Sequence, residues 1–161
     1  MKRINNPYTG LEGYNCFGCS PHNMQGLRMD FFLEGDTVVC KWKPQTYFEG
    51  YSGVLHGGIQ ATLLDEAASW VLFTVLGTSG STTELSVHYK KPVMLTNQEI
   101  TIKARVEKTD KNLVYIKAEL IDSNGTVCTK ADITYFSVPE HIARRRFAYP
   151  GKEAFFAKKE I

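Results

Sequence analysis

Hydrophobic and polar residues alternate along two short segments in the first third of the chain. Residues 27–33 carry hydrophobic side chains at every second position, apart from Phe32, and predict a strand. Residues 38–42 repeat the pattern, and the turn residues 34–36, which include Gly35, separate the two segments. This pattern predicts a β-hairpin.

Residues 59–76 have a different pattern. They contain neither Gly nor Pro and are dense in Ala and Leu, which predicts a helix that ends at Gly77. The segment is apolar on nearly every side, so we expect the helix to be buried rather than to lie on a surface.

Four further segments alternate like strands, at residues 84–89, 100–106, 114–120 and 127–135. The order is therefore two strands, one long helix and then four strands. An antiparallel sheet covers so apolar a helix only if the sheet curves around it. The pattern predicts an α+β fold with a curved antiparallel sheet wrapped around one long central helix. Because such a sheet covers one side of the helix, we also expect a second subunit.

The length of 161 residues suits one domain. We expect this domain to span residues 27–138, after an irregular lead-in at residues 1–26 that is rich in Asn, Gly, Pro and Cys. Residues 139–161 are charged, with three consecutive arginines at 144–146, and read as a surface extension.

The net charge of +2 is too small to indicate a nucleic-acid partner. We find no apolar run of the ~18–20 residues that a membrane span needs, and no secretory signal near Met1. From these features we expect a cytoplasmic protein.

The four cysteines include a C-x-x-C pair, Cys16 and Cys19, with His22 close behind. A zinc site usually needs four ligands, and Cys40 and Cys128 fall inside predicted strands. We therefore predict a local turn at the C-x-x-C rather than a metal site, and no cofactor.

The candidate chemistry lies at the start of the helix. The first turn of a helix offers free N–H groups and a partial positive charge, and glycines there let a ligand approach the backbone. Asp65 falls about two turns after Gly58 on the same line, among small side chains. It is a candidate general base, or a nucleophile, toward a thioester. The alternatives are that Asp65 and Glu66 form a solvated face and that His56 is only a helix cap.

Three stretches resemble one known family. His56-Gly57-Gly58 followed after six residues by Asp65-Glu66 is similar to the signature of hotdog-fold acyl-CoA thioesterases, and within them to the phenylacetate-pathway-like and hydroxybenzoyl-CoA-thioesterase-like branches. Residues 82–92 resemble the T-x-E-L-x-V-x-Y-x-x-P strand of the family. Residues 16–27 resemble the C-F-G-C opening of one subgroup.

The resemblance implies four catalytic positions: Asp65 as the acid, Gly58 as the amide that polarises the thioester carbonyl, His56 as the loop histidine beside it, and Thr82 as a hydroxyl from the facing subunit that places water. The substrate contacts that we expect are Gly50, Tyr51, Gly57, Glu66 and Thr83. Several family members carry Asn or Gln where this chain has Gly50. Candidates for the CoA phosphates are Lys90, Lys91 and residues 144–146, and candidates for an acyl pocket are Tyr47, Trp70 and Phe73.

The resulting prediction is an enzyme that hydrolyses acyl-CoA to a free acid and CoA without a metal or cofactor. We expect a homodimer with shared sites, or a dimer of dimers. The alternatives are an acyl-CoA-binding module without turnover and, less favoured, a hydratase or dehydratase on the same fold.

Overall fold

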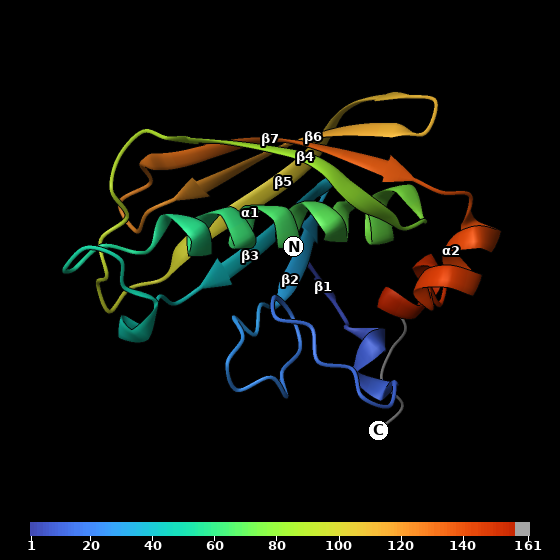
Figure 1. Cartoon of the computed structure of the whole chain (residues 1–161), viewed down its shortest axis with the longest axis horizontal. Helices are drawn as coiled ribbons and strands as arrows, with labels where there is room; N and C mark the ends of the chain where they lie inside the picture. Colours follow the sequence, from blue (N-terminus) through green and yellow to red (C-terminus); the bar gives the residue numbers. More distant parts are fainter. Residues whose placement is uncertain (157–161) are drawn as a thin grey trace.

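The computed structural model describes residues 1–156, and seven antiparallel strands form its single sheet in the order β1-β2-β3-β5-β6-β7-β4 (Figure 1). The strands are β1 (Lys2–Ile4), β2 (Phe31–Glu34), β3 (Thr37–Trp42), β4 (Gly80–Tyr89), β5 (Ile100–Asp110), β6 (Leu113–Ile121) and β7 (Val127–Ser137). The sheet curves over one long helix, which confirms the predicted hotdog fold.

The central helix, α1 (Gly57–Val71), continues as a π-helical turn, η3 (Leu72–Leu76). It ends at Gly77, whose φ of 72° is a left-handed conformation that suits glycine, as the sequence predicts. The 20 residues Gly57–Leu76 are long and apolar enough to cross a membrane by length and composition. This differs from the expectation that the chain lacks an apolar run of that length. In this fold the segment packs against the sheet as its central helix.

The first predicted strand is shorter than expected. Residues 27–30 do not join the sheet, because the backbone N–H groups of Leu27 and Met29 donate to the carbonyls of Phe17 and Gly18. The buried Trp42 indole also donates to the Leu27 carbonyl. The N-terminal segment thus takes hydrogen bonds that a strand would have used.

Strand β4 lies at the edge of the sheet and pairs only with β7 among the described residues. Thr82 pairs with Tyr135 and Glu84 with Thr134, so Thr83 is the extra residue of a β-bulge. A bulge reverses the alternation of side chains that follows it. Both Thr82 before the bulge and Tyr89 after it therefore contact α1.

The two ends of the chain pack beside the C-terminal half of the central helix (Figure 1). The C-terminal segment contains α2 (Glu140–Phe147) and the 3₁₀ turn η4 (Lys152–Phe155); the other 3₁₀ turns are η1 (Pro7–Gly10) and η2 (Thr46–Phe48). Phe155 is fully buried, with its ring 5.6 Å from that of Trp70 and 5.8 Å from that of Phe73.

The predicted surface extension holds for most of α2, whose side chains are largely exposed, but not for Tyr149 and Phe155, which are buried. The last five residues of the predicted extension lie outside the described part. Its charge comes from α2, while Tyr149 and Phe155 complete the core. Trp70 also stacks on Phe31 at 4.4 Å. Trp70 and Phe73 thus belong to an aromatic core rather than to an acyl pocket, and the C-terminal half of the helix is covered by its own chain.

Candidate active site

Asp65 is the centre of a hydrogen-bond cluster between α1 and the sheet. Its Oδ1 accepts from the Thr82 hydroxyl at 3.0 Å and from the Tyr135 hydroxyl at 2.7 Å. Burial, and next the charge of Asp65, raise the pKa of Tyr135, so that its hydroxyl stays a donor. No described residue donates a hydrogen bond to Oδ2, and the residue is partly exposed. Asp65 therefore has one oriented oxygen and one available oxygen.

Thr82 reaches Asp65 within the same chain, so these two side chains belong to the same half of any site that two subunits share. The β-bulge at Thr83 explains this, because it turns Thr82 toward α1 opposite Tyr135. The Thr83 hydroxyl donates to the Thr134 carbonyl, so Thr83 lies outside the Asp65 hydrogen-bond cluster.

The start of α1 differs from the prediction at Gly58. The Gly58 N–H donates to His56 Nδ1 at 2.9 Å, so His56 is the helix cap and this amide is already used. Among residues 1–156 nothing accepts a hydrogen bond from the Gly57 N–H, and the Gly57 carbonyl accepts from the Tyr89 hydroxyl at 2.7 Å. Gly57 therefore has a free amide in the first turn, whereas the Gly58 amide is used by the cap.

A pocket of about 670 Å³ opens beside this free amide. It brings together four predicted residues, Gly50, Tyr51, His56 and Gly57. A Cβ atom on Gly50 would lie 3.2 Å from the His56 Cα, so glycine allows the loop to pack on the histidine. Lys90 and Lys91 line the same pocket and supply positive charge.

The remaining predicted contacts lie elsewhere. Residues 144–146 are on α2, beside the end of the central helix that is far from this pocket (Figure 1). Tyr47 is exposed and packs on Phe48.

Glu66 turns away from Asp65. Its Oε1 accepts a hydrogen bond from the Trp70 indole at 3.1 Å and lies 3.6 Å from Cys16 Sγ. Burial raises the pKa of Glu66 to about 7. The predicted substrate-binding role of Glu66 does not fit this orientation.

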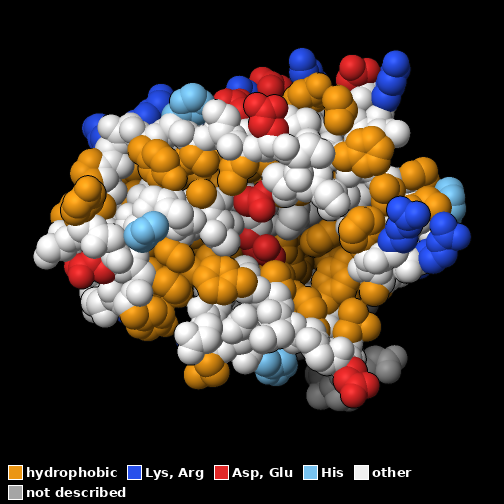
Figure 2. All heavy atoms as spheres, viewed as in Figure 1, with side chains coloured by type: hydrophobic (Ala, Val, Ile, Leu, Met, Phe, Trp, Pro, Cys, Tyr) orange, Lys and Arg blue, Asp and Glu red, His pale blue; other side chains and the backbone are white. Residues whose placement is uncertain are grey.

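Figure 2 shows acidic side chains in the hollowed middle of the face over α1, with hydrophobic side chains on both sides. Asp65 and Glu66 are the acidic residues of this helix.

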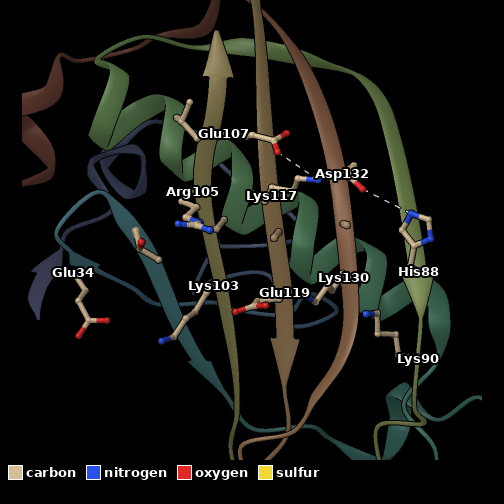
Figure 3. Close-up of a pocket in the computed structure, with 15 residues that line it drawn as sticks. Glu34, His88, Lys90, Lys103, Arg105, Glu107, Lys117, Glu119, Lys130 and Asp132 are labelled. Carbon is tan, nitrogen blue, oxygen red and sulfur yellow. Dashed lines mark ion pairs between the residues drawn. The ribbon is translucent and has the colours of Figure 1, made fainter.

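A larger hollow, of about 840 Å³, lies on the outer face of the sheet (Figure 3). Charges of both signs line it, and they pair with each other: Asp132 lies 2.5 Å from Lys117 and 3.7 Å from His88. None of the residues of the Asp65 cluster lines this outer hollow.

Comparisons with known proteins agree with this arrangement. The family model of the thioesterase superfamily matches residues 52–129, which include α1 and β4. The human protein named acyl-coenzyme A thioesterase 13 is 32% identical over 84 residues, which are 52% of this chain and 59% of that protein. The match thus spans less than two thirds of that relative.

Solved structures give the same class. A hypothetical thioesterase from Streptococcus pneumoniae TIGR4, solved with coenzyme A, has a TM-score of 0.61 and 27% identity over 65% of this chain and 82% of that one. A Streptococcus mutans protein bound to acetyl CoA has a TM-score of 0.66 at 20% identity, over 81% of this chain and 98% of that one, and supports the fold. The fold is a hotdog fold, as in these neighbours. Over residues 52–129, just under half of its length, this chain is similar to the thioesterase superfamily.

Proposed function

We propose that the protein hydrolyses an acyl-CoA thioester to a free acid and CoA, with Asp65 as the catalytic carboxylate. The observation that carries the proposal is the Asp65 cluster, in which Thr82 and Tyr135 hold Oδ1 while Oδ2 remains available. An oriented carboxylate of this kind activates water as a general base, or attacks the thioester carbon as a nucleophile. The names of the relatives and the CoA-bound neighbours support this substrate class.

The free Gly57 amide is the proposed donor to the thioester oxygen, where negative charge develops in the transition state. An α-helix rises about 1.5 Å per residue, so the eight steps from Gly57 to Asp65 separate their backbones by about 12 Å. One carbonyl group does not reach both residues in a single chain. We therefore infer that the complete site combines Gly57 of one subunit with Asp65, Thr82 and Tyr135 of another.

Strand β4 is the proposed surface for this pairing. It is an edge strand of ten residues, with Leu85 partly exposed on it. An unpaired edge of this length is a template for another strand. Two copies of β4 that pair antiparallel about a two-fold axis also bring their α1 helices antiparallel. This arrangement moves the start of one helix toward the middle of the other.

Replacement of Leu85 by Lys tests the shared site. We expect the Leu85→Lys variant to raise the dissociation constant of the dimer by about 100-fold, because the two-fold axis brings like charges together in an apolar interface. Activity is expected to fall with it although Asp65 is intact. Light scattering across a dilution series, beside a thiol-release assay, measures both. Leu11→Lys, on an exposed leucine of the N-terminal segment, is the matched control. A monomeric parent that is fully active would contradict the shared site.

In the sequence, Tyr135 is recognisable only as a position of the strand predicted at residues 127–135. We expect Tyr135→Phe to lower kcat by about 10–100-fold with little change in KM, since it removes a hydrogen bond to a charged group. The control is Tyr115→Phe on β6, whose ring lies under the Lys108 ammonium and away from Asp65. If Tyr135→Phe kept the full kcat, Tyr135 would have no positioning role.

A panel of acyl-CoA substrates, assayed for release of free thiol, tests the proposed activity directly. Turnover of at least one acyl-CoA supports the proposal. Tight acyl-CoA binding without thiol release would instead identify a binding module, and hydration of an enoyl-CoA in a parallel assay would identify a hydratase.

A further inference from the structure

Two neighbouring cysteines of the N-terminal segment meet a glutamate of α1 that is distant from them in the sequence. Cys16 and Cys19 belong to the N-terminal segment and Glu66 to the helix, 50 positions after Cys16. One ligand atom from each, the two Sγ atoms and a carboxylate oxygen, lie within 4.8 Å of one another. Sulfur and oxygen ligands of a tetrahedral zinc ion lie about 3.5–4 Å apart, so these atoms need to move little to enclose one.

The loop between the cysteines is shaped around the Cys16 sulfur. The Cys19 side chain, and the backbone N–H groups of Cys19 and Gly18, hydrogen-bond to it. Donors that point at a sulfur stabilise the thiolate, which is the form that binds metals. The loop therefore favours a metal-binding state of Cys16.

A surrounding shell of contacts orients the other two donors. The Trp70 indole N–H donates to Glu66 Oε1 at 3.1 Å, and the Tyr14 hydroxyl lies 2.9 Å from Cys19 Sγ. A Cβ atom at Gly18 would overlap the Glu66 carboxyl group, so glycine lets the loop press onto it. Hydrogen bonds that fix the direction of ligands are typical of metal sites.

The charge of the cluster lacks a protein counter-ion. Among residues 1–156 no Lys, Arg or His forms an ion pair with Glu66. A thiolate and a carboxylate held together and partly shielded from water are costly unless a cation joins them. Two sulfur ligands favour zinc over calcium or magnesium, which take oxygen ligands.

We propose that Cys16, Cys19 and Glu66 bind one zinc ion, with a solvent molecule as the fourth ligand. The sequence favours a local turn over a metal site because Cys40 and Cys128, the further ligands it offers, fall inside predicted strands. Glu66 supplies a third ligand from the helix instead. The ion would link the N-terminal segment to the turn of α1 that carries Asp65. Its role is structural, since Glu66 turns away from the Asp65 cluster.

Elemental analysis of the full chain, purified without a metal-binding tag and dialysed with zinc, tests the site. We expect about one zinc ion per chain in the parent and a loss of most of it in Cys16→Ser, Cys19→Ser and Glu66→Gln. Cys128→Ser is the matched control, because Cys128 lies outside the cluster and contacts Asp122. A parent that holds no zinc, or a Glu66→Gln variant that holds as much as the parent, would overturn the proposal.

A second measurement covers variants that fold poorly. Cobalt added to the metal-free parent is expected to give the near-ultraviolet absorption of a cobalt–thiolate bond. A zinc chelator is expected to lower the Tm of the zinc-loaded parent. Tyr14→Phe, which removes the hydroxyl beside Cys19, is expected to weaken zinc binding by about 10-fold. Finding no cobalt–thiolate band while Cys16 and Cys19 of the parent are both reduced would refute the zinc site.

Discussion

We expect the Asp65→Asn variant to lose most thioesterase activity, with kcat/KM on the best acyl-CoA lowered by about 10²–10⁴-fold. The amide has the shape of the carboxylate and keeps an oxygen that accepts from Thr82 and Tyr135. It has no charge with which to activate water or attack a carbonyl group. The fold is therefore expected to stay intact while the chemistry stops, as measured by thiol release and by circular dichroism.

Asp132→Asn is the matched control for this experiment. It makes the same chemical change on the outer face of the sheet, where Asp132 pairs with Lys117 and His88. Its activity is expected to stay close to that of the parent. An Asp65→Asn variant as active as the parent would eliminate Asp65 as the catalytic carboxylate, and the proposed mechanism with it.

The second large effect is on stability. We expect Phe155→Ala to lower the free energy of unfolding by about 3–5 kcal/mol, because it leaves a cavity in a closed aromatic cluster. Phe155 is fully buried, and its ring lies within 6 Å of the rings of Trp70, Phe73 and Tyr149. Urea denaturation followed by tryptophan fluorescence measures the change.

Phe147→Ala separates burial from mere removal of an aromatic ring. Phe147 lies at the end of α2 and is 38% exposed, so its loss is expected to cost less than about 1 kcal/mol. Equal costs for the two variants would show that the C-terminal segment is not part of the core.

The sequence predicted the fold well where a periodic pattern decides the structure. The helix of residues 59–76 and its end at Gly77 agree closely with α1 and η3, because apolar periodicity and a left-handed glycine are local signals. The sequence predicted only a surface extension at the C-terminus, because the arginines of α2 dominate the composition of that segment. Tyr149 and Phe155 are too widely spaced to form a periodic pattern, so their burial left no local signal.

The candidate site shows the same division. The motif from His56 to Asp65 was sufficient to choose the helix and its acid. The resemblance implied a role for Thr82, but neither its contact with Asp65 nor the role of Tyr135 was readable, because a single extra residue at Thr83 reverses the strand alternation and decides which side chains face α1. A tyrosine on the inner face of a predicted strand, with a hydroxyl that needs a partner, was the one available hint.

The sequence alone thus determined the order of six strands and the central helix, and the acid on that helix, since these follow from residue types at fixed spacings; it did not predict β1 or α2. Only the tertiary structure decided three things: that Gly58 is capped by His56 while Gly57 keeps a free amide, that Thr82 and Tyr135 hold Asp65, and that Glu66 joins Cys16 and Cys19. The His56 cap is a local contact that the sequence left open as one of two alternatives. The other two contacts depend on distances between residues remote in the chain. Packing sets those distances, and local pattern does not.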